Sequence, residues 1–205
     1  MKKVLITGGQ GDIAKAIEEL LKNRGGYEVR SPGRRELDVT DIDSIQRYVN
    51  GFVPDALINN AGYVAPQSIK DADIDSMRRS LDVNLGGVFC CAAVALRCNP
   101  RLEIINIGSS AATKVHATWS SYCAAKSAVV MATRCWAADG LYAVCLSPGR
   151  TLTKMRKGLY PDEDPETLMS PRDFAVVVEK ALRREYASGS HIAVTKQNVK
   201  ELMHG

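Results

Sequence analysis

The chain has 205 residues, of which 45% are hydrophobic and 24% charged, and its formal net charge is +4. This composition is that of an ordinary globular protein and excludes a disordered or fibrous one. The length predicts a single domain over residues 1–205, because two ordinary domains need a longer chain. Positive charge is scattered among acidic residues without a basic block, so we expect no nucleic acid as a partner.

The amino-terminal segment MKKVLITGG contains an apolar run of only four residues before its glycines. A signal peptide needs a longer apolar stretch and a cleavage site, so no targeting segment is predicted. No other apolar window approaches the length that crosses a bilayer. We therefore expect a soluble, cytoplasmic protein without membrane contact.

Six cysteines lie in the middle of the chain without CxxC spacing, at Cys90, Cys91, Cys98, Cys123, Cys135 and Cys145. This pattern predicts neither a disulfide framework nor a metal site. Most of the thiols are expected to act as small buried hydrophobic groups.

Short runs rich in valine and isoleucine alternate with helical patterns along the chain. The strand-like runs are VLIT, YEVRS, DALINN, EIINIG, YAVCLS and HIAVT, and long helical patterns occupy residues 73–97 and 120–138. Such alternation predicts βα units and a parallel sheet. The expected fold class is α/β, a Rossmann-like, doubly wound and mostly parallel sheet with helices on both faces.

A glycine-rich turn, from Thr7 to Ala14, connects the first strand-like run to the first helical pattern. Glycines let a backbone approach a pyrophosphate closely, and the amino terminus of the following helix offers free N–H groups and partial positive charge. The turn reads G-x-x-G-x-x-A, beginning with Gly8 and Gly11. A tight structural turn uses the same residues, so the pattern alone leaves both interpretations open.

Tyr122 and Lys126 are four residues apart in a helical pattern and therefore share one helix face. A phenol has a pKa near ~10, and a nearby ammonium that favours its phenolate would make it a useful acid and base at neutral pH. By itself the YxxxK spacing is common and describes a surface pair equally well.

Seven motifs in order resemble the short-chain dehydrogenase/reductase family, and the match runs from Met1 to about Thr195. They are the glycine turn, LDV at 37–39, NNAG at 59–62, VNLGGVF at 83–89, INIGSS at 105–110, YCAAK at 122–126 and SPGRTLT at 147–153. Their order and spacing are specific to that family. The resemblance implies a nicotinamide-dependent oxidoreductase that interconverts a carbonyl and an alcohol.

The resemblance implies a catalytic set of Asn84, Ser109, Tyr122 and Lys126. Ser109 would hydrogen-bond the substrate oxygen, and Tyr122 would exchange a proton with that oxygen as hydride moves. Lys126 would also hold the nicotinamide ribose, and Asn84 would position a water that links Lys126 to solvent. No metal ion is expected.

The resemblance also implies the residues that bind the cofactor. They are Gly8, Gly11, Asp12 and Ile13 at the turn, Asp38 and Val39 at the adenine, Asn60, Ala61 and Gly62 at the adenosine ribose, Thr151 and Thr153 at the carboxamide, with Tyr122 and Lys126. For Asp38 a simple turn residue remains an alternative. His116 and Trp119 are candidates for substrate contact, although residues that only fill a loop explain them equally well.

Two features depart from the common pattern of the family. The glycine turn is the form found in its extended branch, but only ten residues follow HIAVT, too few for the substrate domain of that branch. The interval from Ser31 to Asp38 is too short for the helix that usually follows the second strand. We expect that covering helix to be missing and the sheet edge to be exposed there.

The residues after the second strand predict a preference for NADP over NAD. The run from Val29 to Arg35 has no acidic residue, whereas a carboxylate at this position would bind the ribose hydroxyls of NAD. Ser31 and Arg34 are the candidate ligands of the 2′-phosphate, with Arg35 as a substitute. Arginines that only solvate an exposed edge are the alternative.

Three further expectations concern assembly and function. The helices at 73–97 and 120–138 are expected to form a homodimer or homotetramer interface. The segment 154–171 is expected to be a mobile lid over a small-molecule substrate, with no firm role for Arg150. A non-catalytic dinucleotide-binding redox regulator, or a small epimerase or enoyl reductase, remains an alternative function.

Overall fold

The computed structural model describes residues 1–204, and its six strands form one parallel sheet. The strands are β1 (Lys2–Ile6), β2 (Tyr27–Arg30), β3 (Ala56–Asn59), β4 (Glu103–Ile107), β5 (Tyr142–Pro148) and β6 (His191–Val194). Their order across the sheet is β2-β1-β3-β4-β5-β6. The strand order therefore reverses between β1 and β3: β2 is added on one side of β1 and all later strands on the other. In such a sheet, ligands bind beyond the carboxyl ends of the strands at this point.

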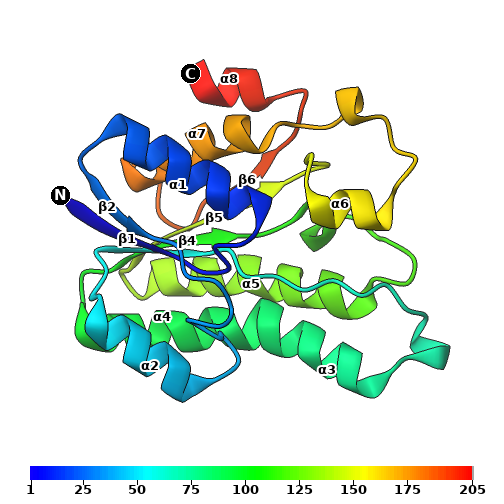
Figure 1. The fold of residues 1–205 in the computed structure, drawn as a ribbon, viewed down its shortest axis with the longest axis horizontal. Coiled ribbons are helices and arrows are strands. Elements are labelled where there is room, and N and C mark those ends of the chain that lie inside the picture. The colour runs from blue at the N-terminus through cyan, green and yellow to red at the C-terminus, as the bar shows by residue number, and fades with distance from the viewer. Residues whose placement is uncertain (205) are drawn as a thin grey trace.

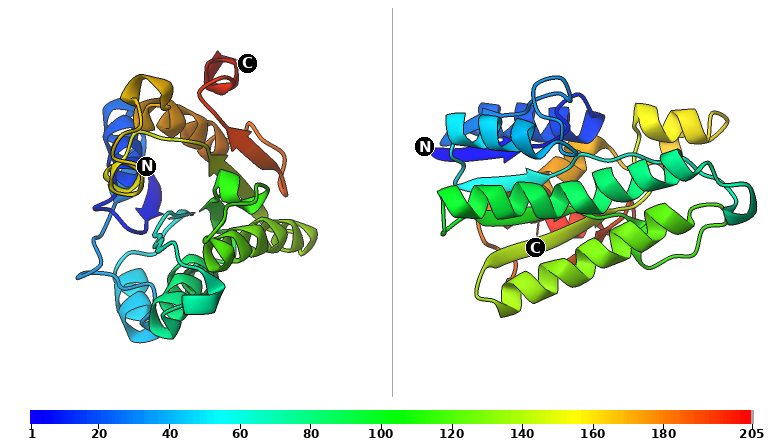
Figure 2. Two further views of the ribbon diagram at one scale, coloured as in Figure 1. Left: turned by 90° about the vertical axis from the view of Figure 1, so that its right-hand side faces the viewer. Right: turned by 90° about the horizontal axis from the view of Figure 1, so that it is seen from below.

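Helices cover both faces of the sheet, as Figures 1 and 2 show. On one face lie α1 (Asp12–Arg24), α7 (Pro171–Leu182) and α8 (Val199–His204). On the other face lie α2 (Ile42–Gly51), α4 (Gly87–Cys98) and α5 (Ser120–Ala138). Beyond the carboxyl ends of the strands lie α3 (Ile74–Leu81) and α6 (Lys154–Leu159). The predicted α/β class and doubly wound sheet are confirmed.

The central strands are buried on both faces, which explains their nearly continuous apolar sequences. All four residues of β3 and all five of β4 are buried. At the edge, β2 is only half-buried, and residues 31–41 join it to α2 without a helix. The predicted loss of one covering helix is therefore confirmed, and Arg34, Arg35 and Glu36 are exposed there.

Local sequence signals explain where several helices begin and end. The carboxylate of Asp41 accepts hydrogen bonds from the N–H groups of Asp43 and Ser44 and caps α2. Ser170 caps α7 in the same way, directly before Pro171. At the other end of a helix, α1 stops at Gly25, whose φ of 74° is in the region that favours glycine.

A π-helical turn, Asp82–Gly86, joins α3 and α4 into one continuous helix. This helix, Ile74–Cys98, has 25 residues with a mean hydropathy of 1.5 in its most apolar window, so by length and composition it could cross a membrane. The expectation that no window approaches this length was wrong. The reason is that the π turn continues the apolar helix α4 without a break toward α3, and one face of this long helix packs against the sheet.

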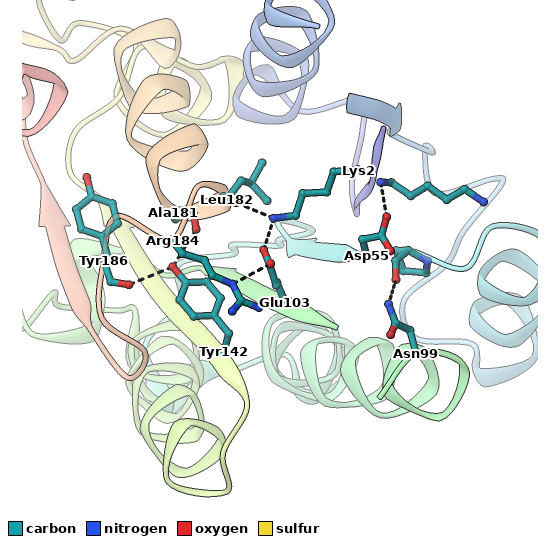
Figure 3. A network of polar contacts seen from close by, with 11 residues as sticks. Lys2, Asp55, Asn99, Glu103, Tyr142, Ala181, Leu182, Arg184 and Tyr186 are labelled. Carbon is teal, nitrogen blue, oxygen red and sulfur yellow. Dashed lines mark hydrogen bonds and ion pairs between the residues drawn. The ribbon is translucent and has the colours of Figure 1, made fainter. Parts of the chain in front are cut away.

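A polar network closes the amino ends of the strands (Figure 3). The ammonium of Lys2 on β1 pairs with Glu103 on β4 and donates to the carbonyl of Leu182. Arg184 pairs with the same carboxylate at 2.9 Å and lies over the ring of Tyr142. The Tyr142 hydroxyl donates to the carbonyl at the end of α7. The network therefore links β1, β4, β5 and the end of α7.

The six thiols are free and are distributed differently from the expectation. Only Cys91 and Cys145 are buried, Cys135 is exposed, and the other three are half-buried. The expectation that most are buried was wrong, because one side of both α4 and α5 faces outward. Burial raises the pKa of Cys91 to about 12 and also raises the pKa of Cys145, so the two buried thiols stay protonated.

Candidate active site

A cavity of about 410 Å³ opens beyond the carboxyl ends of the strands. Most residues that the sequence singles out line it, although they come from segments far apart in the chain. These are Gly8, Gly11, Asp12, Ile13, Arg34, Asp38, Val39, Asn60, Ala61, Gly62, Ser109, Tyr122, Lys126, Thr151 and Thr153. Asn84 and Ser31 are not part of the lining. Within residues 1–204, no three His, Cys, Asp or Glu side chains group closely enough to hold a metal ion.

The glycine turn has the backbone that its sequence suggests. Gly8 has a φ of 71°, which a residue with a side chain rarely adopts. A Cβ on Gly9 would overlap the carbonyl of Ser31, so the turn is pressed against the end of β2. Because Gly11 at the start of α1 has no side chain to cap the helix, the first N–H groups of α1 face the cavity mouth uncapped.

The NNAG motif holds the glycine turn in place. The Thr7 hydroxyl accepts hydrogen bonds of 3.0 Å from the N–H groups of Asn60 and Ala61. In return, the Asn60 amide donates to the carbonyl of Thr7 at 2.9 Å. The ends of β1 and β3 are thus fixed to one another at the point where the strand order reverses. Sequence reasoning did not foresee this contact of Thr7.

Ser31 is half-buried, packs against Gly9 and does not line the cavity. Its hydroxyl oxygen has no hydrogen-bond partner within residues 1–204. Arg34, by contrast, lines the cavity and pairs with Asp38 at 2.9 Å. Partial burial opposes ionisation of Asp38, but hydrogen bonds from Thr40 and Arg34 hold the pKa of that carboxyl below its usual value. This part of the cavity therefore carries a fixed negative charge beside its arginine.

Tyr122 and Lys126 lie on one face of α5, with the Lys126 ammonium 5.8 Å from the centre of the phenol ring. Lys126 is 3% exposed and donates a hydrogen bond of 2.8 Å to the carbonyl of Ile107. Burial lowers the pKa of Lys126 to about 8 and raises the pKa of Tyr122, although Ser109 lowers the latter. The expected lowering by Lys126 is absent, because its ammonium is directed at a carbonyl.

Ser109 lies two residues after the end of β4, and a second serine fixes its main chain. Its N–H donates to the hydroxyl of Ser147 on β5 at 3.1 Å. That hydroxyl lies 2.8 Å from the ring nitrogen Nε2 of His191 on β6. Burial, helped by Arg134, lowers the pKa of His191, which keeps the ring neutral at pH 7. Three adjacent strands thus fix the main chain of Ser109.

Buried amides hold α5 on the sheet. The amide of Asn59 on β3 donates to Asn106 on β4 at 2.9 Å, and Asn106 donates to the Thr133 hydroxyl at 2.9 Å. Thr133 in turn donates to Val129 within α5. All the polar atoms that make these contacts are buried, so this series of hydrogen bonds fixes α5 in one position on the sheet. The same helix carries Tyr122 and Lys126.

Asn84 is fully buried within the π turn. Its amide donates to the carbonyls of Tyr63 and Ser80 at 2.6 and 2.8 Å, and its oxygen accepts from the N–H of Tyr63 at 3.2 Å. The side chain therefore fixes the segment that follows NNAG. Single π turns are frequent at functional sites, and no pattern in the sequence announces this one.

The two aromatic candidates both line the cavity near Tyr122. The ring of Trp119 meets that of Tyr122 edge-on at 5.6 Å and stacks with Tyr160 at 6.4 Å. The ring of His116 lies 5.2 Å from that of Trp119. These rings form an aromatic cluster beside the ring of Tyr122.

The segment after β5 is more ordered than a long irregular loop. It contains α6, capped by the Thr153 hydroxyl, and Thr151 bridges to Met169. The N–H of Lys154 donates to the Asp12 carboxylate at 2.6 Å, which ties α6 to the glycine turn. Two arginines hold Glu163: Arg156 in a bidentate pair and Arg150 at 3.2 Å. Arg150 thus has a structural contact, and Arg156 lines the cavity.

Comparison with known proteins gives one family. The model described as short chain dehydrogenase matches residues 27–164. The cis-4-hydroxycyclohexanecarboxylate dehydrogenase of Sinomonas cyclohexanicum is 30% identical over 190 residues, which cover 77% of this chain and 76% of that protein. The dTDP-4-dehydrorhamnose reductase of Aggregatibacter actinomycetemcomitans is 33% identical over 99 residues, but these are 48% of this chain and only 32% of that protein.

Solved structures share the fold over nearly the whole chain. A 4-hydroxyisoleucine dehydrogenase complexed with NADH has a TM-score of 0.79 at 21% identity and covers 95% of this chain and 96% of its own. A small-chain dehydrogenase in complex with NADPH has a TM-score of 0.84 at 20% identity, with 97% and 99% covered. At these identities the likeness establishes the fold alone.

Proposed function

This chain belongs to the short-chain dehydrogenase/reductase family, and on that premise we propose that it is an NADP-dependent oxidoreductase in which Tyr122 is the acid and base. The enzyme interconverts a carbonyl and an alcohol. One observation carries the proposal: a single cavity joins the glycine turn to Ser109, Tyr122 and Lys126. A non-catalytic regulator would have no need to retain these three side chains together.

The residues at the cavity fit a nicotinamide dinucleotide. The uncapped start of α1 offers N–H groups to a pyrophosphate, and Gly8 and Gly9 leave the backbone close to it. Thr151 and Thr153 line the same cavity. When bound, the cofactor supplies or accepts the hydride, and the protein orients the reactants and moves the proton.

In the reducing direction, the carbonyl carbon gains a hydride and the carbonyl oxygen gains the phenol proton of Tyr122. Ser109 donates a hydrogen bond to that oxygen and polarises the bond before transfer. The raised pKa of Tyr122 keeps the phenol protonated at neutral pH, as a general acid requires. Lys126, whose pKa is near 8, is poised to return a proton to the site.

For NADP rather than NAD, the support comes from Arg34 and Arg35, which line a depression beside the cavity together with Gln10 and Asp38. A guanidinium binds a phosphate through charge-assisted hydrogen bonds. Ser31, whose hydroxyl is buried and unpaired, would have to turn outward to take part. Asp38 opposes the preference, because its carboxylate already holds Arg34 and repels a phosphate.

Titration of both cofactors, followed by the fluorescence of Trp119 and Trp136, tests the cofactor assignment. Arg34→Ala should weaken NADPH binding by about 10- to 100-fold and leave NADH binding unchanged. Arg47→Ala on α2 is the matched control, because its guanidinium is exposed and lies outside the lining. Equal affinity of the wild type for both cofactors would overturn the NADP assignment and leave Asp38 as the determinant.

A screen of aldehydes, ketones and alcohols, with cofactor absorbance as the readout, tests the reaction itself. Turnover of at least one carbonyl compound is expected. If the protein binds the cofactor but reduces or oxidises none of them, the catalytic proposal is wrong and the regulator, epimerase and enoyl reductase alternatives return.

We also propose a homodimer or homotetramer built on α4 and α5. The outward sides of these helices expose Phe89 and Met131, which are 45% and 57% accessible, beside small residues. Exposed apolar side chains on adjacent helices are typical of an interface. Light scattering at micromolar concentration should give at least twice the mass of one chain, and a monomeric mass would refute the proposal.

A further inference from the structure

The part of the cavity beyond the residues assigned to the cofactor is lined by basic side chains and by no carboxylate. Beyond the residues assigned to the cofactor, its lining includes Tyr63, Arg79, His116, Trp119, Met155 and Arg156. The only carboxylates in the whole lining are Asp12 and Asp38, which belong to the glycine turn and the adenosine end. An anionic group is therefore favoured where the substrate binds.

Arg79 on α3 supplies a guanidinium that the rest of the protein does not use. It lies 4.6 Å above the ring of Tyr63 and makes no ion pair with any carboxylate of residues 1–204. The other arginine of this region, Arg156, is neutralised by a bidentate pair with Glu163. Arg79 is thus available to a ligand, whereas Arg156 is not.

The platform under Arg79 is fixed. The hydroxyl of Tyr63 contacts the Ser76 hydroxyl at 3.1 Å, and its main chain is bound on both sides by Asn84. Stacking on an aromatic ring restricts the guanidinium and leaves its N–H groups free at the edge. A guanidinium held in this way can donate two parallel hydrogen bonds to the two oxygens of a carboxylate.

Another part of the cavity lining is apolar. Trp119 stands edge-on to the phenol of Tyr122 and stacks with Tyr160, so a hydrocarbon body can lie against it. A ligand that fills this part of the cavity would place its reacting carbon near Tyr122 and its charge at Arg79.

We propose that the substrate is an oxo or hydroxy carboxylic acid with an apolar body, and that Arg79 binds its carboxylate. This inference rests on the proposed function and names the substrate class of the same site. In reduction the carbonyl carbon receives the hydride from the reduced nicotinamide, the C=O π bond breaks, and the new alkoxide takes the proton of Tyr122. The carboxylate of the substrate is unchanged, so Arg79 contributes to specificity and not to the chemical step.

The test compares oxocyclohexanecarboxylate with its methyl ester in the wild type and three variants. Arg79→Met should lower kcat/KM for the acid by about 10- to 100-fold and leave that for the ester unchanged. Arg79→Lys should recover part of the loss, because it restores the charge. Arg78→Met is the matched control, since Arg78 is exposed on the same helix and does not line the cavity.

Binding is measured separately, by calorimetry of the protein with cofactor and the inert probe cyclohexanecarboxylate. The wild type should bind this anion and Arg79→Met should not. If the carbonyl screen gives no turnover at all but the anion binds through Arg79, the proposed function fails and the anion site stands. If the ester reacts as well as the acid, or Arg79→Met slows both equally, the site is not selective for an acid and the inference is overturned. Competition by inorganic phosphate alone would point to a phosphate ester and would also overturn it.

Discussion

The two ends of the sheet hold their lysines in opposite ways. At the amino ends of the strands, Lys2 pairs with a carboxylate that Arg184 also holds (Figure 3). At the carboxyl ends, Lys126 is more deeply buried and meets only a carbonyl. A buried charge without a counter-charge costs free energy. The polar contacts at the amino ends of the strands therefore stabilise the fold, whereas the buried ammonium of Lys126 at the carboxyl ends destabilises it.

The largest expected effect is on catalysis at the carboxyl end. Tyr122→Phe removes the proton donor and keeps the ring against Trp119, so kcat should fall by about 10²- to 10⁴-fold. Cofactor affinity and thermal stability should remain close to those of the wild type. Steady-state kinetics, cofactor titration and a thermal melt measure the three quantities. Near-normal turnover by the purified variant would rule out the assigned acid and base.

The second effect is a gain in stability from Lys126→Met. Folding lowers the pKa of Lys126 from 10.5 to about 8, so at pH 7 the folded protein holds a disfavoured charge. The variant should abolish activity and raise the free energy of unfolding at pH 7 by ~2 kcal/mol, after allowing for the lost hydrogen bond. A rise in Tm at pH 7 is the measurement.

The same variant should show a diagnostic pH dependence. Between pH 8 and about 10.5 the unfolded wild type binds more protons than the folded one, so wild-type stability rises with pH. The advantage of Lys126→Met should therefore shrink over this range. An advantage that is constant with pH would mean that improved packing, and not the buried charge, explains it.

The third effect is a loss of stability at the amino end. Glu103→Gln leaves Lys2 and Arg184 without a counter-charge, and both are partly exposed, so the expected loss is only about 1 kcal/mol. Denaturant unfolding measures it, with kcat unchanged. Glu18→Gln, which breaks the exposed pair with Lys22, is the control and should cost less. An equal loss in both variants would remove the contrast between the two ends.

The smallest effect concerns the segment 154–171 over the cavity. Amide exchange in this segment should slow when cofactor and a substrate analogue bind, because the segment closes over them. Glu163→Gln, which weakens the contacts with Arg150 and Arg156, should speed exchange a few-fold without ligand. Equal protection with and without ligands would show that the segment does not act as a lid.

Sequence patterns predict the fold and the cavity lining well, because both depend on local alternation and on short motifs at strand ends. The six apolar runs each became a strand, and the YCAAK motif lies on α5 beside the cavity. The orientation of Ser31 was not predictable, since it depends on the close approach of Gly9. The shared carboxylate of Glu163 and the contact of Ser147 with His191 are likewise long-range and have no local signal.

The π turn within the long helix also has an evolutionary consequence. A π turn is an α-helix that has gained one residue, so the loss of a single codon within Asp82–Gly86 could restore a regular helix. Such a deletion would rotate α3 by about 100° relative to α4. The apolar face of α4 would stay in the core, but Arg79 would turn away from Tyr63 and from the cavity. If Arg79 binds the substrate as proposed, a single deletion in this turn would therefore change the substrate range of the protein.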